Sequence, residues 1–230
     1  MKKKIFFCLK IFFLILMLIG INGLFKWHND KKDIENINEL VTNYIYENED
    51  GEYVLEEEIN YYNDDVIAWL KIDGTNINYP VVQTSDNKYY LNRDFTKEKN
   101  SAGWVFMDSN NKLTDQNIII YGHHRKDGIM FGDIDKLFKE KYYKDYEGKI
   151  LLVSNNENRY YKIFSVYTAS TEENYTLNNF SNFSNKIEEF KNKSDISFNV
   201  DTSDLNQIIT LSTCHNNNKD RLVVHAYRIE

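Results

Sequence analysis

The sequence predicts a mainly β domain with flanking helices, in the form of a barrel or a sandwich. Two observations support this. After residue 63 the chain divides into short runs that are rich in β-branched and aromatic residues and are bounded by polar turn residues. Its 230 residues are 42% hydrophobic and 15% aromatic, which provides one sizeable core. Disordered, collagen-like, coiled-coil and disulfide-scaffold classes are therefore excluded.

The first 27 residues form an apolar leader. It opens with three lysines and is almost wholly apolar from residue 5 to residue 25, interrupted only by Lys10. About 20 such residues suffice for a helix to span a bilayer, and no small-residue cleavage site follows them. We therefore expect residues 1–27 to be a cytoplasmic tip and an uncleaved single-pass signal-anchor, with the body outside the cell. A cleaved secretion signal is the alternative, and it places the body outside as well.

The remainder of the chain is acidic. With five of the 28 basic residues in the leader, it retains 23 basic residues against all 35 acidic ones, which argues against a nucleic-acid partner. Within residues 28–62, Ile34, Ile37 and Val41 recur at helical spacing. We expect one or two helices there, as a stalk or flank between the membrane and a domain at residues 63–230.

That domain is predicted to contain eight or nine strands and two helices. The strand candidates are residues 66–72, 77–83, 103–107, 117–121, 149–153, 160–167, 196–200, 207–213 and 222–229. Asp73 and Gly74 supply a turn between the first two, and Pro80 suggests an edge or bulged position in the second. Core-facing helices are predicted from two apolar stripes: Met130, Phe131, Ile134, Leu137 and Phe138, and Phe180, Phe183, Ile187 and Phe190.

Cys214 is the only cysteine outside the leader, and it lies in the segment ITLSTCHNNNKDRLVVHAYRI. A lone thiol in an exported domain is either an inert buried residue or a nucleophile. The strands predicted on either side of it resemble an antiparallel hairpin, so Cys214 and Arg221 are expected to face each other across its mouth. In that position a guanidinium can stabilise a thiolate or bind the oxyanion formed at an attacked carbonyl.

The second candidate segment is NIIIYGHHRKDG, in which a predicted strand ends in Gly122, His123 and His124. A strand that ends in this way can present an imidazole at a barrel rim. An imidazolium stabilises a thiolate and protonates a leaving amine. The competing interpretation is a metal site built from these histidines, His215 and Cys214. No pair of them has the usual ligand spacing, so we expect no metal and no cofactor.

The motifs TLSTC and RLVV, with YGHHRKDGIMFGD upstream, resemble those of the sortases and especially of class B sortases. The resemblance spans about residues 63–229. It includes NYPVVQTSDNKYYL and the segment STEENYTLNNFSNFSNKIEEF, which looks like the helix-bearing loop of class B. It implies a closed eight-stranded β-barrel with N-terminal helices, a membrane anchor, and a helix in a long loop before the penultimate strands.

The resemblance also implies functional residues. Cys214 would be the nucleophile, His123 the general acid/base and Arg221 the stabiliser of the oxyanion and the substrate. His123 is preferred to His124 because the imidazole of the family motif directly follows the glycine. Looser matches to the class B substrate groove imply that five further residues bind substrate: Asn87, Leu91, Thr171, Tyr175 and Ser212.

The implied reaction is transpeptidation at a Gram-positive cell surface. Cys214 would attack the backbone carbonyl of the Thr in an NPQTN-like sorting motif near the C-terminus of a secreted protein, so that cleavage follows the Thr. An amine of the peptidoglycan precursor would resolve the resulting thioester. Three alternatives stay open: a pilin-polymerising sortase, although no lid segment is visible; a cysteine L,D-transpeptidase, although its compact His-Gly-Cys motif is absent; and a non-catalytic, membrane-anchored peptide-binding module with an inert Cys214.

Overall fold

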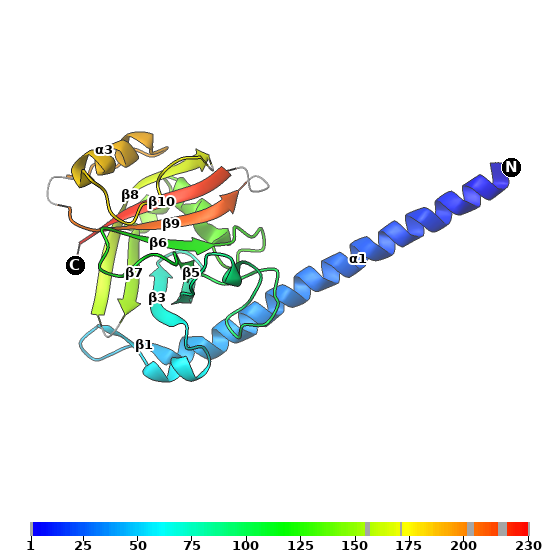
Figure 1. The fold of residues 1–230 in the computed structure, drawn as a ribbon, viewed down its shortest axis with the longest axis horizontal. Coiled ribbons are helices and arrows are strands. Elements are labelled where there is room, and N and C mark those ends of the chain that lie inside the picture. The colour runs from blue at the N-terminus through cyan, green and yellow to red at the C-terminus, as the bar shows by residue number, and fades with distance from the viewer. Residues whose placement is uncertain (1, 155–156, 171, 202–204, 216–219, 230) are drawn as a thin grey trace.

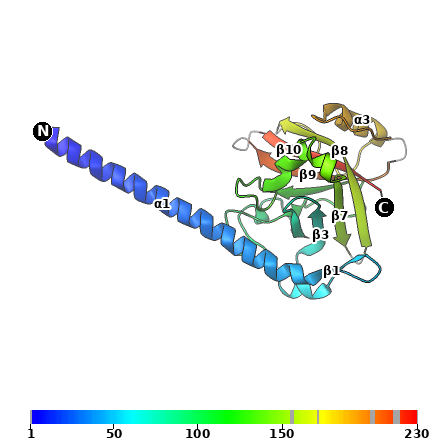
Figure 2. The ribbon, with the colours of Figure 1, turned by 180° about the vertical axis from the view of Figure 1, so that it is seen from behind.

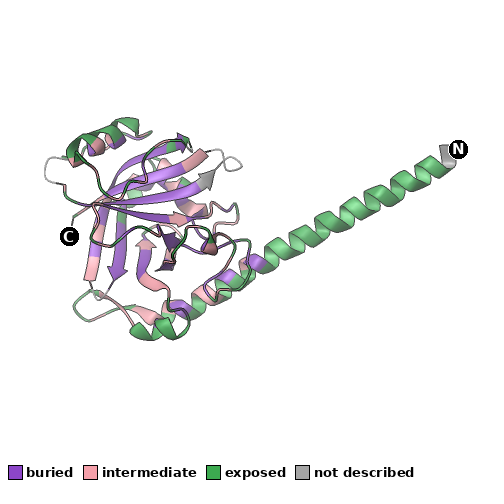
Figure 3. Ribbon diagram, viewed as in Figure 1, coloured by how far each residue is buried: buried purple, intermediate pink, exposed green. Residues whose placement is uncertain are grey.

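The computed structural model describes residues 2–154, 157–170, 172–201, 205–215 and 220–229. It consists of a barrel from which one long helix, α1 (Lys2–Val41), projects (Figure 1). Among the described residues, α1 is the one helix that is long and apolar enough to cross a membrane. Residues 4–29 of α1 are exposed, whereas buried positions occur from residue 30 onward, where the helix meets the barrel (Figure 3).

The expectation of further helix after residue 41 is only partly met. A 3₁₀ turn η1 (Thr42–Tyr44) ends α1, and a small hairpin of β1 (Ile45–Glu47) and β2 (Tyr53–Leu55) follows, then η2 (Glu57–Tyr61). The hairpin forms because the Asn48 side chain accepts hydrogen bonds from the backbone N–H groups of Asp50 and Glu52, at 3.0 and 2.9 Å. Such an Asx turn competes effectively with a helix.

Eight strands close into a barrel in the order β10-β8-β7-β3-β4-β5-β6-β9. The strands are β3 (Val66–Ile72), β4 (Asn78–Val82), β5 (Phe106–Met107), β6 (Asn117–Gly122), β7 (Lys149–Ser154), β8 (Glu157–Ser170), β9 (Ile208–His215) and β10 (Asp220–Arg228). The β4–β5 and β6–β9 pairs are parallel and the others antiparallel. This confirms the predicted closed eight-stranded barrel.

Pro80 lies opposite Trp69 of β3, in a strand that has neighbours on both sides. Its position nevertheless resembles an edge, because β5 pairs with β4 only through Val82 and Phe106. The Pro80 carbonyl instead accepts a hydrogen bond from the indole Nε1 of Trp104 at 2.8 Å. A proline is tolerated here because the missing N–H is not needed for a ladder.

The strand predicted at residues 196–200 is wrong. Ile196 is buried and Phe198 and Val200 pack against the core, so the alternating pattern marks a buried face, but these residues form no strand. The physical reason is closure: β8, the strand beside this segment, already pairs with β7 and β10 and has no free edge.

Both helices predicted in the barrel domain are present, but their lengths differ from the prediction. The stripe after Met130 becomes a 3₁₀ helix, η4 (Gly132–Phe138), followed by the short α2 (Tyr142–Asp145). The second stripe becomes α3 (Phe183–Lys193), in the long loop before β9. Figures 1 and 2 show α3 against the barrel beside β8 and β10. There its Ile187 and Phe190 join a second hydrophobic cluster with residues of those strands.

Candidate active site

Three neighbouring strand ends form one rim of the barrel. β9 lies between β6 and β10, so the end of β6 and the start of β10 flank the end of β9. Gly122 of β6 lies opposite Thr213, and Arg221 of β10 lies opposite Cys214. His123 directly follows Gly122. The backbone positions of all three residues that the sequence singled out as catalytic therefore meet at this rim, while the side chains of Cys214 and His215 lie outside the described structure.

A cleft of about 220 Å³ opens at the rim. Its lining residues are Asn87, Leu91, Phe106, Tyr121, Gly122, His123, Ser212, Thr213 and Arg221. Five of the residues predicted from the resemblance are among them. Phe106, Tyr121 and Thr213 were not foreseen as site residues. Thr213 directly precedes Cys214, and the alternation along β9 was the only signal that could have indicated its position.

The imidazole of His123 is held by the backbone. Its Nε2 lies 2.7 Å from the carbonyl oxygen of Leu91. Because a carbonyl can only accept, Nε2 carries a proton in this arrangement, and Nδ1 is the nitrogen left to exchange protons with a reacting group. Gly103, with φ of 63°, packs against the same imidazole. A Cβ there would lie 2.9 Å from His123 Cδ2 and 2.9 Å from the Leu91 oxygen. Only glycine fits both the space and the backbone conformation.

Arg221 is half-buried at the start of β10, where its Nη1 donates to the Asp220 carbonyl at 3.3 Å. Its charge acts on Tyr121 of the same cleft. Burial and the neighbouring Asp108 raise the pKa of Tyr121, and Arg221 acts in the opposite direction. The Tyr121 phenol therefore stays neutral and donates to Asp108 Oδ2 at 3.0 Å. The guanidinium is thus a positive charge at a rim where an oxyanion could form.

Asn87 belongs to the wall opposite the strand ends. Its Nδ2 donates to Asp108 Oδ2 at 2.8 Å, and its Oδ1 accepts from the Ser109 N–H at 2.7 Å. Asp108 thereby holds both Asn87 and Tyr121 in place, which fixes the amide orientation. The structure places the predicted Asn87 in the cleft with one further amide N–H to offer a ligand.

Two more predicted substrate residues contact each other. The hydroxyls of Tyr175 and Ser212 lie 3.0 Å apart, with 5% and 1% of the residues exposed. Tyr175 comes from the loop before α3 and Ser212 from β9, so this hydrogen bond ties the loop to the strand that carries Cys214. Thr171, the fifth predicted substrate residue, lies outside the described residues.

A buried polar network beneath the cleft was missed. Thr210 Oγ1 donates to Asn117 Oδ1 at 2.6 Å and lies 2.8 Å from Nδ1 of His225. The His225 Nε2 lies 3.2 Å from the Tyr167 hydroxyl. Asn117 in turn donates from Nδ2 to the backbone carbonyls of Tyr175 and Leu177, at 3.2 and 2.9 Å. The only signal in the sequence was that polar residues occupy otherwise apolar strands.

The remaining histidine of the motif has a different role. His124 Nε2 lies 2.8 Å from Asp135 Oδ2 of η4, at the edge of the rim, and does not line the cleft. Within the described ranges, no group of three or more His, Cys, Asp or Glu side chains is arranged to hold a metal ion. His123 and not His124 is therefore the imidazole that faces the cleft.

The chain matches known proteins along most of its length. A family model described as the sortase domain matches residues 70–229. The chain is 36% identical over 179 residues to sortase B of Staphylococcus aureus, covering 74% of this chain and 72% of that protein. It is also 36% identical over 172 residues to sortase B of Listeria monocytogenes, covering 71% of this chain and 70% of that protein.

Solved structures agree with these matches. A crystal structure of sortase B from B. anthracis in complex with AAEK1 superposes with a TM-score of 0.76 at 31% identity, covering 88% of this chain and 99% of that one. A Staphylococcus aureus sortase B–substrate complex gives a TM-score of 0.70 at 34% identity, covering 76% and 84%. The closed eight-stranded barrel with its N-terminal helix matches these sortase B structures.

Proposed function

The chain belongs to the sortase family as a class B cysteine transpeptidase, and on this premise we propose that it joins secreted proteins to the cell wall through Cys214, His123 and Arg221. One observation carries the assignment of these residues. The register of β6, β9 and β10 brings them to one rim, next to a cleft lined by His123 and Arg221.

The substrate is the sorting motif of a secreted protein, cleaved after threonine. A related sortase B from Staphylococcus aureus has been solved as a substrate complex, which supports a peptide substrate for this cleft as well. The apolar side of the cleft, with Leu91 and Phe106, suits side chains of the motif. Asn87 and Arg221 supply polar groups that can orient its backbone.

The reaction proceeds in two halves. The Cys214 thiolate attacks the carbonyl carbon of the threonine itself, and Arg221 stabilises the negative charge on the carbonyl oxygen. His123 then gives a proton to the departing amine as the peptide bond breaks, which leaves a thioester. In the second half a cell-wall amine attacks the thioester carbonyl and His123 accepts its proton. The new amide forms and the Cys214 thiolate is released.

α1 anchors the enzyme in the membrane, with its lysine-rich amino end in the cytoplasm and the barrel outside. Its exposed residues 4–29 include the entire apolar run, so these side chains have no protein surface to cover them. β6 and β9 run toward the side from which α1 leaves the barrel (Figure 1). The cleft at their ends then faces the membrane, where a freshly exported substrate and a cell-wall precursor can both reach it.

The test uses the full-length protein in detergent micelles. It is incubated with peptides that span several threonine-containing sorting motifs, and intact-mass spectrometry follows acyl adducts on Cys214. We expect an adduct that ends in threonine, release of that adduct by an amine, and neither in Cys214→Ala. If no peptide gives an adduct and the folded protein resists alkylation at Cys214, the enzyme assignment is wrong and a peptide-binding module replaces it.

A further inference from the structure

The barrel end of α1, residues 27–41, is packed against the catalytic body and is called the docked segment below. Asp30, Ile34 and Val41 are buried, with 7%, 0% and 0% of the residues exposed, and their spacing places them on one face of the helix. Ile37 packs beside them. A tether would need no such face, since a flexible linker holds a domain near a membrane equally well.

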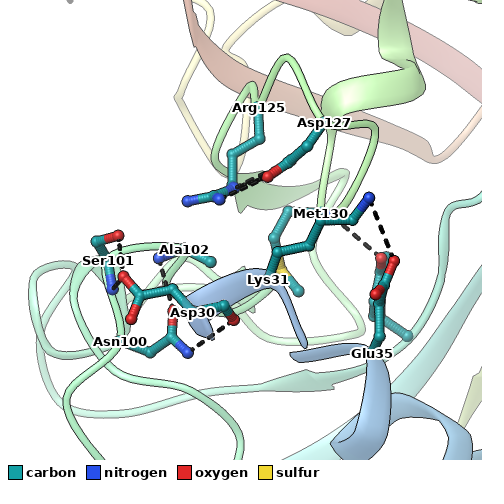
Figure 4. Close-up of polar contacts among 10 residues, drawn as sticks. Asp30, Lys31, Glu35, Asn100, Ser101, Ala102, Arg125, Asp127 and Met130 are labelled. Atoms are coloured by element: carbon teal, nitrogen blue, oxygen red, sulfur yellow. Dashed lines mark hydrogen bonds and ion pairs between the residues drawn. The ribbon is translucent and has the colours of Figure 1, made fainter. Parts of the chain in front are cut away.

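Asp30 joins the docked segment to the turn at residues 100–102 (Figure 4). Its carboxylate accepts hydrogen bonds from the Ser101 hydroxyl and from the Ser101 N–H, the latter at 3.2 Å. Its backbone carbonyl accepts from Asn100 Nδ2 at 3.1 Å, and Asn100 Oδ1 accepts from the Ala102 N–H at 2.9 Å. A buried carboxylate is costly without such partners, so these bonds hold the helix at one place on the turn.

The same turn runs directly into the support of His123. The Gly103 N–H donates to the Asn100 carbonyl at 3.2 Å, which closes the turn. Gly103 then lies against the imidazole, so close that a Cβ would be 2.9 Å from His123 Cδ2. The imidazole is also held by Leu91, whose carbonyl oxygen accepts a hydrogen bond from Nε2 at 2.7 Å. Gly103 packs against this same carbonyl. Ser101, which binds Asp30, is only two residues from Gly103, which touches the imidazole. A shift of the turn would therefore move the support of the imidazole.

A second contact reaches the segment that follows His123. The Arg125 guanidinium lies over the Trp27 ring, 5.1 Å from its centroid. Arg125 is 8% exposed and is paired with Asp127, with Nη2 2.6 Å from Oδ2. A cation on an indole face contributes roughly 0.5–2 kcal/mol, more where water is excluded. The docked segment thus contacts two parts of the chain near His123. One is the turn at residues 100–102, and the other is Arg125, two residues after His123.

We propose that the docked segment of α1 positions the His123 imidazole, so that the membrane anchor is a working part of the active site. The proposal rests on the proposed function for the role of His123, and it adds Asp30 and Trp27 as positioning residues. Neither touches the cleft. Their effect is on geometry: a misplacement of about 1 Å between reacting groups costs up to about 100-fold in rate, without any change in the residues that do the chemistry.

The experiment compares full-length variants in detergent micelles with the peptide found to acylate the wild-type enzyme. Asp30→Ala and Trp27→Ala are expected to lower kcat about 10-fold with KM nearly unchanged, and to alter the pH profile of kcat. The matched control is Lys31→Ala. Lys31 lies next to Asp30 on the same helix and pairs only at 3.4 Å with Glu35, so its loss should change kcat less than 2-fold. Ser101→Ala repeats the test from the other side of the contact, without altering the helix.

A readout independent of activity separates this proposal from the proposed function. Imidazole signals of ¹³C-labelled histidines are followed by NMR, and His123→Gln identifies the signal of His123. We expect that signal to move and broaden in Asp30→Ala and Ser101→Ala while the His225 signal stays fixed. Unchanged kcat and pH profile in Asp30→Ala, Trp27→Ala and Ser101→Ala, with an unchanged His123 signal in the two variants followed by NMR, would overturn the positioning role. Absence of any acyl adduct in the wild type would instead overturn the proposed function.

Discussion

The rim of the barrel and the sealed layer between the barrel and α3, called the interior below, each contain an imidazole. His123 lies at the open end, half-buried, with its Nε2 bound to a backbone carbonyl and with the cleft beside it. His225 lies in β10, four residues beyond Arg221, with none of its surface exposed. It is stacked on Phe190 of α3 with ring centroids 3.9 Å apart. One residue type therefore occurs at an open cleft and in a sealed setting.

The interior network fixes the proton positions on His225. Asn117 donates both bonds from Nδ2, so its Oδ1 can only accept, and the single Thr210 hydroxyl proton goes to it. Thr210 must then accept from His225, which places the imidazole proton on Nδ1. The other ring nitrogen accepts from the Tyr167 hydroxyl. Every group is used, so this imidazole has no capacity left for proton transfer.

Burial and charge reinforce this difference. Desolvation, with Lys186 and Lys193 of α3 nearby, lowers the pKa of His225 to about 3. A neutral, fully bonded imidazole is a packing element with polar partners, and such a network specifies one arrangement of the core. Among the described residues, His123 is instead bound through one ring nitrogen, and it lies next to a cleft. The comparison indicates that the number of ring nitrogens held in hydrogen bonds, together with burial, separates the histidine that we propose as catalytic from the structural one.

The largest effect is expected at the rim. His123→Gln should lower kcat/KM by about 10²–10⁴, because glutamine cannot shuttle a proton, while the free energy of unfolding should change little. His124→Gln is the matched control, since His124 pairs with Asp135 outside the cleft and its loss should cost less than about threefold. Peptide-cleavage kinetics and urea denaturation of both variants measure this. A His124 variant as impaired as the His123 variant would contradict the assignment.

Arg221→Lys is expected to lower kcat by about 10-fold or more, because an ammonium lacks the planar donor fork that can hold an oxyanion. The same strand offers its own control. Arg228 lies at the far end of β10 and pairs with Glu157 at 2.7 Å, so Arg228→Lys should leave kcat unchanged. Single-turnover acylation, read by mass spectrometry, isolates the step concerned. Equal rates for wild type and Arg221→Lys would remove the oriented-donor role.

In the interior the loss should appear in stability. His225→Phe retains the stack on Phe190 but leaves the Tyr167 hydroxyl without its acceptor, and we expect the free energy of unfolding to fall by about 1–3 kcal/mol. Activity of the folded fraction should change less than about threefold. Adding Thr210→Val tests the network, because the double variant should cost less than the sum of the singles. Strict additivity in urea denaturation would show that the residues act independently.

These results also show what the sequence could and could not predict. The hairpin that pairs Cys214 with Arg221 followed from two apolar runs around a short polar segment, since local alternation fixes antiparallel register. Local pattern likewise predicted α3. The strand predicted at residues 196–200 was wrong. Alternation there marked a buried face, but the closed barrel offered no free strand edge for this segment to pair with.

Contacts between distant segments were beyond the sequence. The sealed setting of His225 could not be predicted locally, because its burial depends on α3 and the position of its proton on Asn117, both far away in the chain. The same holds for the Tyr175–Ser212 hydrogen bond and for the packing of Asp30 on Ser101. The resemblance located residues of the cleft, but the three-dimensional structure was needed to see which of them bind each other.

The smallest expected effect is a pH dependence of stability that originates in the interior. The folded-state pKa of His225, about 3, lies below the ordinary value of 6.5, so the unfolded chain binds the proton more readily. The contribution of neutral His225 to the free energy of unfolding is therefore fully present above about pH 6.5 and is lost as the pH falls toward 3. Between pH 6.5 and pH 5 the loss should be about 1.5 kcal/mol.

Urea denaturation at these two pH values can isolate the contribution of His225. Carboxylates such as Glu157, whose pKa Arg159 and Arg228 lower to about 2, lose their contribution only below about pH 4.5 and stay outside this window. Wild type and His225→Phe share every other histidine, so the difference between their pH slopes belongs to His225. We expect the variant to be flatter by about 1.5 kcal/mol. Equal slopes would mean that His225 takes up a proton as easily in the folded protein as in the unfolded chain, and the sealed interior site would then not differ from the open rim.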